Sequence, residues 1–87
     1  MASYKVLIKP SAVKEIEDLP RKDRRRVVER IRALASAPRP TGCVKLSAGE
    51  KFRVRQGSYR IVYSISDPEK TVLVVKVGHR GEVYRDD

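Results

Sequence analysis

The sequence predicts an α+β fold, in which a small, mostly antiparallel sheet of four to five strands carries two N-terminal helices on one face. Residues 4–9 alternate between apolar and polar side chains, which is typical of a strand. Residues 12–36 place apolar side chains at helical spacing, and residues 51–80 return to strand patterns. Because helices and strands are segregated in the order βααβββ, we expect both helices to pack on the same side of the sheet.

The helical region is predicted to divide into two helices at Pro20. The first covers residues 12–18, with Ser11 as its expected N-cap. The second covers residues 21–36 and ends before Pro38, with apolar residues such as Val27 and Ile31 on one side. Arginines occupy much of the remaining surface of this second helix.

The stretch KFRVRQGSYRIVYSI, residues 51–65, predicts a β-hairpin closed by the two-residue turn Gly57-Ser58, of the type that begins with glycine. Such a turn fixes the register of the two strands. The expected pairs are Arg55 with Arg60, Val54 with Ile61, Arg53 with Val62, and Phe52 with Tyr63.

This register separates the hairpin into an apolar face for the helices and an uncovered face that carries Arg53, Arg55 and Arg60. Like charges placed across a strand pair are destabilising. A phosphate among the three guanidinium groups relieves their repulsion by accepting charge-assisted hydrogen bonds. We therefore expect an anion-binding concavity; the alternative is an ordinary solvated sheet face.

The last strand is predicted over TVLVVKVGHR, residues 71–80, after a turn at residues 67–70. Its nearly continuous apolar run is typical of a central strand covered on both faces, although Lys76 interrupts the pattern. Residues 82–84 are a candidate fifth strand after Gly81.

Composition favours a polyanionic partner. Lys and Arg number 20 against 11 Asp and Glu, so the net charge is +9 and the sequence pI is about 10.1. Nucleic acid is the first candidate, and a merely charged surface is the alternative. The 87 residues are expected to form one domain, residues 1–87.

Cofactors, disulfides and membrane segments are not expected. Cys43 and His79 are the only residues of their types, so neither an internal disulfide nor a zinc site is predicted. The apolar stretch TVLVVKV is too short to span a bilayer, and the N-terminus lacks an apolar signal segment. We expect a cytoplasmic protein that needs no cofactor and has no membrane partner.

The motif FRVRQGSYRIVYSI, followed by VVKVGHRGEVY, resembles the RelE branch of the RelE/ParE toxin superfamily. AVKEIEDLP, PRPTG and KL occur upstream in the matching order. The resemblance implies a toxin of a type II toxin-antitoxin pair, with a fold similar to small microbial ribonucleases, that cleaves mRNA in the ribosomal A site. It also implies a cognate acidic antitoxin, ribosomal RNA as a binding partner, and binding of the complex to operator DNA through the antitoxin.

The resemblance implies catalytic roles for five residues. Arg53 and Arg55 match positions that are basic, often lysine, in the family, and Arg60 matches a phosphate-stabilising arginine. Arg80 matches another arginine of the site, and Tyr84 matches a tyrosine proposed as general base. Arginine in place of lysine keeps the charge but not the ability to transfer a proton near neutral pH, so a proton-carrying role is in doubt at Arg53 and Arg55.

The chemistry implied is attack of a ribose 2′-hydroxyl on the adjacent phosphate without a metal ion. For Tyr84 the alternative is a packing or stacking role. His79 is a secondary candidate, because imidazole is a common acid or base. In a regular strand, however, His79 and Arg80 point to opposite faces, so we expect His79 to be structural.

The basic helix and Lys45 are candidate RNA contacts, in which Arg24, Arg25 and Arg26 bind phosphates. The alternative for the helix is a solvated surface. The main alternative function is that of ParE-like relatives, which poison DNA gyrase by binding. A plain RNA-binding module fits the sequence less well, because such modules stack bases on exposed aromatic side chains and most aromatic residues here occupy apparent core positions.

Overall fold

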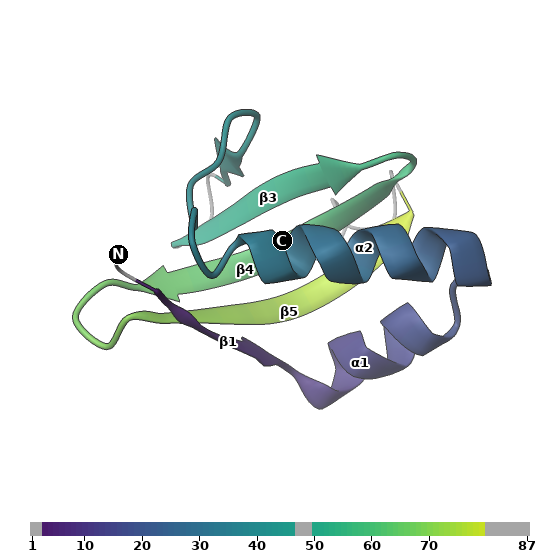
Figure 1. The fold of residues 1–87 in the computed structure, drawn as a ribbon, viewed down its shortest axis with the longest axis horizontal. Helices are drawn as coiled ribbons and strands as arrows, with labels where there is room; N and C mark the ends of the chain where they lie inside the picture. The colour runs from purple at the N-terminus through teal and green to yellow at the C-terminus, as the bar shows by residue number, and fades with distance from the viewer. Residues whose placement is uncertain (1–2, 47–49, 80–87) are drawn as a thin grey trace.

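The fold is a five-stranded sheet with two helices packed on one face, as Figure 1 shows, and it confirms the predicted α+β class. The computed structural model describes residues 3–46 and 50–79. In chain order the elements are β1 (Lys5–Ile8), α1 (Pro10–Glu17), α2 (Arg21–Ala33), β2 (Val44–Lys45), β3 (Lys51–Gln56), β4 (Tyr59–Ser66) and β5 (Thr71–His79).

The strands follow the order β1-β5-β4-β3-β2 across the sheet. β2, β3, β4 and β5 pair antiparallel with their neighbours, whereas β1 joins β5 in parallel. β5 therefore lies inside the sheet, between β1 and β4, as its apolar run predicted. In the described part of the chain, however, the helices cover one face of β5 and not both.

The strand β2 was not predicted, because two residues are too short to show a periodic pattern. It pairs with Phe52 and Arg53 of β3 and forms one edge of the sheet. The candidate strand at residues 82–84 lies outside the described residues.

The boundaries of α1 differ from the predicted ones at both ends, whereas α2 begins at Arg21 as predicted and ends earlier. α1 begins at Pro10, and its N-cap, Lys9, makes no side-chain capping bond, so the expected cap at Ser11 is wrong. Proline suits the first turn of a helix, because it has no N–H that would need a partner there. α2 ends at Ala33, and residues 34–36 form a turn that closes onto its last carbonyls. Neither helix, within the described residues, has the length and apolar character needed to cross a membrane.

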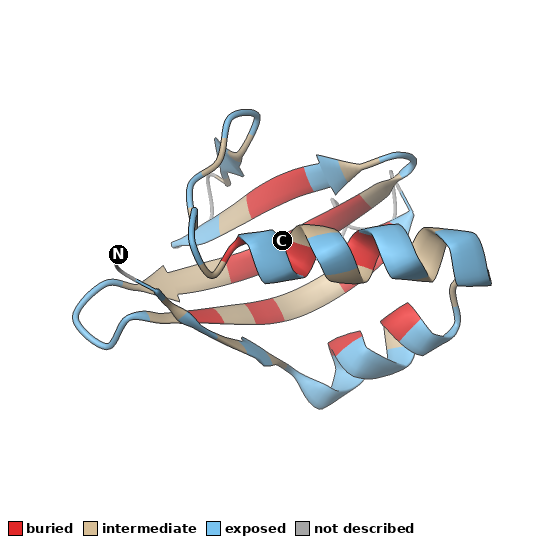
Figure 2. Ribbon diagram, in the orientation of Figure 1, coloured by how far each residue is buried: buried red, intermediate tan, exposed pale blue. Residues whose placement is uncertain are grey.

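The core lies between the helices and one face of the sheet. Figure 2 shows the buried positions on the inner sides of α1 and α2 and on the strands beneath them. The helices contribute Ala12, Ile16, Val27, Ile31 and Leu34, and the strands contribute Val54, Ile61, Tyr63, Val72, Val74 and Val77. Burial of these side chains is the main term that holds the helices to this face.

The hairpin of β3 and β4 has the register that its turn predicts. Arg55 lies opposite Arg60, Val54 opposite Ile61, Arg53 opposite Val62, and Phe52 opposite Tyr63. Gly57 has a φ of 61°, while Ser58 does not share this left-handed conformation. A positive φ at the first turn residue alone is the requirement that favours glycine there.

A β-bulge interrupts the pairing of β4 with β5. Tyr63 pairs with Val74, but Val62 pairs with Lys76, so Val75 is an extra residue in β5. The bulge reverses the faces of the residues that follow it. Val77 consequently enters the core with 2% of its surface exposed, and Lys76 is kept out of it.

Candidate functional site

Three arginines, Arg53, Arg55 and Arg60, lie together on the sheet face opposite the helices, which we call the arginine face. Their strand neighbours Val54 and Ile61 are fully buried in the core, and side chains alternate between the two faces of a strand. Arg55 and Arg60 are direct cross-strand partners. The arrangement predicted from the hairpin register is therefore present in the structure.

Two of the three arginines are more deeply buried than we expect for side chains on an uncovered face. Arg55 is exposed, but Arg53 and Arg60 retain only 9% and 6% of their accessible surface. Long side chains that lie along a sheet bury their stems against neighbouring residues. The expectation that all three project freely from an open face is thus wrong for two of them.

Neighbours across the strands account for part of this burial. Arg53 lies between Val44 of β2 and Val62 of β4 in the sheet, so apolar residues flank it on both sides. Arg60 lies between Arg55 and Gly78. Gly78 is itself buried and places no side chain beside Arg60.

The arginine face becomes less polar toward β1. The row Lys51, Ser64, Leu73 and Leu7 runs across it, and Leu7 is 46% exposed. The face therefore combines three arginines near the hairpin turn with Leu73 and Leu7 toward β1, where the exposed Lys5 lies on the same face as Leu7.

His79 lies on the helix side of the sheet and not on the arginine face. It pairs with Tyr59, and their rings meet edge to face with centroids 5.3 Å apart. The Tyr59 hydroxyl in turn donates to Asp23 of α2 at 3.3 Å. Burial and the Asp23 carboxylate raise the pKa of Tyr59, so this hydroxyl stays protonated at neutral pH. Arg80 and Tyr84, the remaining predicted site residues, lie outside the described residues.

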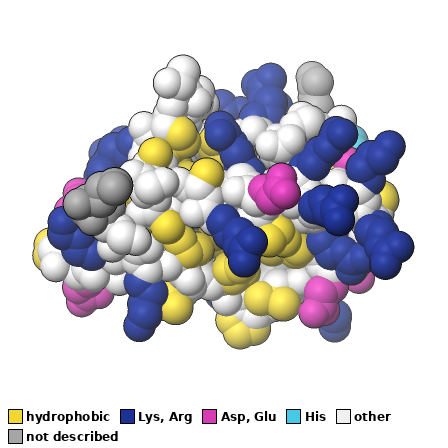
Figure 3. Space-filling model, in the orientation of Figure 1, with side chains coloured by type: hydrophobic (Ala, Val, Ile, Leu, Met, Phe, Trp, Pro, Cys, Tyr) yellow, Lys and Arg dark blue, Asp and Glu magenta, His cyan; other side chains and the backbone are white. Residues whose placement is uncertain are grey.

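A basic surface covers the first half of α2, where Figure 3 shows Lys and Arg side chains gathered together. Arg25 and Arg26 are exposed, while Arg24 is half-buried. A hollow of about 1110 Å³ lies among these side chains, lined by Arg21, Lys22, Arg24, Arg25, Arg26, Val28, Glu29 and Arg32. This surface belongs to the helix layer, so it is separate from the arginine face.

Lys45 does not join either basic surface. It is exposed on β2 and pairs with Phe52, whose side chain faces the helix side. The hollow beside it is also lined by Arg39 and Asp67. The candidate RNA contacts predicted from the sequence thus occupy two separate places.

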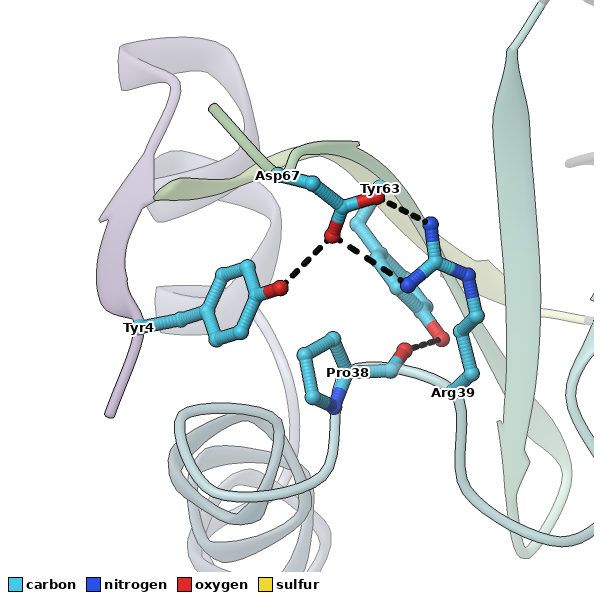
Figure 4. Close-up of polar contacts among 5 residues, drawn as sticks. All are labelled: Tyr4, Pro38, Arg39, Tyr63 and Asp67. Carbon is cyan, nitrogen blue, oxygen red and sulfur yellow. Dashed lines mark hydrogen bonds and ion pairs between the residues drawn. The ribbon is translucent and has the colours of Figure 1, made fainter. Parts of the chain in front are cut away.

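A polar cluster ties three loops together at the end of β4 far from Arg60, and Figure 4 shows its contacts. Arg39 donates to both carboxylate oxygens of Asp67, at 3.3 and 3.0 Å, and the Tyr4 hydroxyl donates to the same group at 2.6 Å. Beside them, the Tyr63 hydroxyl donates to the Pro38 carbonyl at 2.8 Å.

This cluster shifts the pKa values of its members in opposite directions. Hydrogen bonds from Arg39 and then Tyr4 lower the pKa of Asp67, and the bond to Asp67 raises the pKa of Tyr4. Burial raises the pKa of Tyr63. The cluster therefore holds an ionised carboxylate and neutral tyrosines, which suits a structural tie between loops.

The residues that sequence reasoning missed are Glu15 and Gly78. Glu15 of α1 contacts β5 next to the bulge, and the bulge is what brings Gly78 opposite Arg60. One signal was present in the sequence, since Lys76 breaks the apolar run of β5 at the bulge. Within residues 3–46 and 50–79, no group of three His, Cys, Asp or Glu side chains is arranged to hold a metal ion.

The sequence matches a family of toxins. A family model described as the ParE toxin of the type II toxin-antitoxin system parDE matches residues 6–84. Toxin RelG of Mycobacterium tuberculosis is 44% identical over 34 residues, and this segment covers 39% of the present chain and 39% of RelG.

Two solved complexes resemble nearly the whole chain. One is the archaeal RelE-RelB complex from Pyrococcus horikoshii OT3, with 32% identity, a TM-score of 0.81, and coverage of 91% of this chain and 97% of that one. The other is the toxin-antitoxin complex RelBE2 of Mycobacterium tuberculosis, with 30% identity, a TM-score of 0.80, and coverage of 90% and 99%.

Proposed function

Because the chain belongs to the ParE toxin family of type II toxin-antitoxin systems, within the RelE/ParE superfamily, we propose that it is a cytoplasmic ribosome-dependent endoribonuclease that cleaves mRNA in the A site. The observation that carries the proposal is the arginine face. Arg53 and Arg60 are largely buried there, and the exposed Arg55 lies directly opposite Arg60. Such a set of guanidinium groups is suited to hold a phosphate that gains charge.

The reaction is attack of a ribose 2′-oxygen on the adjacent phosphorus. The bond to the 5′-oxygen of the next nucleotide breaks, leaving a 2′,3′-cyclic phosphate; the 2′-hydroxyl gives up a proton and the departing 5′-oxygen takes one. The phosphorane formed on the way carries more negative charge than the diester. Arg53, Arg55 and Arg60 stabilise this added charge, which lowers the barrier without a metal ion.

Proton transfer requires a group other than these arginines, because a guanidinium does not deprotonate near neutral pH. In the proposal Tyr84 accepts the 2′ proton and Arg80 adds a further cation. His79 is not given a role, since it lies on the helix side against Tyr59.

Binding to the ribosome is assigned to the exposed basic surfaces. Arg24, Arg25 and Arg26 of α2, together with Lys45, contact phosphates of ribosomal RNA and hold the toxin in place. Contacts of this kind carry little sequence information, so they position the protein and leave cleavage to the arginine face.

A cognate acidic antitoxin is part of the proposal. Both solved relatives were crystallised as toxin-antitoxin complexes. A chain with a net charge of +9 favours a partner of opposite charge. The antitoxin neutralises the toxin and connects the complex to operator DNA.

A second candidate function is poisoning of DNA gyrase by binding. The observation that favours it is the matching family model, which describes ParE toxins. A binding toxin of this kind has no need for three guanidinium groups gathered on one sheet face, so the arginine face favours the nuclease.

A translating cell extract separates the two. The nuclease predicts cuts in mRNA that appear with translating ribosomes and disappear when ribosomes are removed. Breaks in DNA that depend on gyrase, with mRNA left intact, would establish the alternative.

A further inference from the structure

The end of β5 that borders Arg60 has no strand along its outer side in the described sheet. β1 pairs with β5 from Thr71 to Val74, and the Lys9 N–H still donates to the Val74 carbonyl. The chain then enters α1, so β1 supplies no partner to the residues of β5 that follow. Val77 is one of these residues and is 2% exposed, and a buried N–H without a partner is strongly unfavourable.

Glu15 supplies the missing partner from α1. Its Oε1 accepts the Val77 N–H at 2.9 Å, and its Oε2 accepts the Lys76 ammonium at 3.2 Å. The side chains of Glu15 and Lys76 are 33% and 29% exposed, so this pair is partly shielded from solvent. One carboxylate thus fixes two successive residues just after the bulge.

The residues that Glu15 holds determine what lies beside Arg60. Before the bulge, Tyr63 pairs with Val74. If this register continued without the bulge, Val77 would lie opposite Arg60. The bulge instead places Gly78 there and turns Val77 into the core opposite Ile61. The shift therefore puts a glycine beside Arg60 in place of a β-branched side chain, and Gly78 is itself buried there.

We propose that Glu15 is a positioning residue for the arginine face: by binding the Val77 N–H and Lys76, it holds the end of β5 so that Gly78 stays beside Arg60. The effect on cleavage rests on the proposed nuclease function. The effect on β5 itself does not, so the two are measured separately.

The first measurement is the single-turnover rate of mRNA cleavage at saturating ribosomes. Glu15→Ala removes both contacts, and we expect a fall of about tenfold, because a small displacement of a stabilising group reduces the rate. Glu15→Gln keeps an oxygen that accepts the Val77 N–H and should recover most of this loss. Glu17→Ala changes the net charge equally on the same helix, at an exposed position, and should cleave as the wild type does.

The second measurement is amide hydrogen exchange in the isolated protein. Glu15→Ala should lower the protection of Val77 and Gly78, while Glu15→Gln and Glu17→Ala should leave it nearly unchanged. Unaltered protection in Glu15→Ala overturns the proposal, and so does lowered protection with cleavage equal to that of Glu17→Ala. A wild-type protein that cleaves no mRNA overturns the nuclease, while the exchange data still decide whether Glu15 holds β5.

Discussion

The arginines of α2 and those of the sheet have the same chemistry in opposite environments. Arg25 and Arg26 are exposed on the helix, whereas Arg53 and Arg60 keep only 9% and 6% of their accessible surface. An exposed charge is solvated and screened by salt, so a single contact contributes little, whereas many exposed charges together attract a polyanion. A buried charge acts through a lower dielectric and in a fixed place. In the proposed function, this difference assigns attraction of RNA to the helix and phosphate chemistry to the sheet.

The largest expected effect is that of removing a buried arginine. Arg60→Ala should lower cleavage by about 10² to 10³, the range seen when one donor to a developing negative charge is removed. Ribosome binding should stay close to that of the wild type, because the exposed basic residues remain. The measurement is single-turnover cleavage beside a sedimentation assay for ribosome binding.

Arg25→Ala is the matched control for Arg60→Ala, since it removes the same group from an exposed position. Its cleavage rate at saturating ribosomes should not change. Equal losses of cleavage in the two variants would end the distinction between buried and exposed arginines. A thermal melt of Arg60→Ala checks that the variant is folded, because truncating a largely buried side chain lowers stability as well as removing the charge.

A smaller effect, on binding alone, is expected for the helix. Arg25→Gln combined with Arg26→Gln should reduce the slope of log K against log salt by about 1 to 2, because two phosphate contacts are lost. The control is Lys9→Gln with Lys14→Gln, an equal change of charge at exposed positions near α1. If both double variants change the slope equally, α2 is a solvated surface and not an RNA contact.

The hairpin was predictable because its information is local. A two-residue turn starting with Gly57 fixes every pair from Gln56 with Tyr59 to Phe52 with Tyr63, and alternation then assigns Arg53, Arg55 and Arg60 to one face. No distant part of the chain is needed for this step. The cationic half of the candidate site therefore follows from a continuous stretch of sequence.

Two features depend on contacts between distant segments: the burial of the arginines, and the face of the sheet on which each residue of β5 lies after the bulge. Glu15 reaches the Val77 N–H because β1 ends at Ile8 and leaves that part of β5 without a neighbouring strand. Gly78 lies opposite Arg60 because the bulge shifts the register. Lys76 signals an interruption, but the sequence alone does not say whether the strand ends or bulges there. The start of α1 is local information, because Pro10 suits the first turn of a helix and so favours a start before Ser11.

The smallest effect should come from an ion pair at the protein surface. In the Arg39–Asp67 pair both side chains are about half exposed, at 49% and 55%, so burial gives it little strength. Hydrogen bonds from Arg39, and then from Tyr4, lower the pKa of Asp67 in the folded protein. A carboxyl group whose folded pKa is depressed contributes stability above its unfolded pKa of about 3.9, and loses it as pH falls through the folded pKa.

Asp67→Asn should therefore be slightly less stable than the wild type at neutral pH, and the difference should shrink below about pH 4 as the wild type loses its ionised pair. Thermal melts from neutral pH down to about pH 3 measure this, with Glu69→Gln as the control because it removes an exposed carboxylate from the same turn. If the difference in melting temperature between the wild type and Asp67→Asn stays constant with pH, the charge of the Asp67 carboxylate does not contribute to stability. A loss as large as that from replacing a core residue such as Leu34 would contradict the rule drawn from the arginines, that burial decides how much a charge contributes.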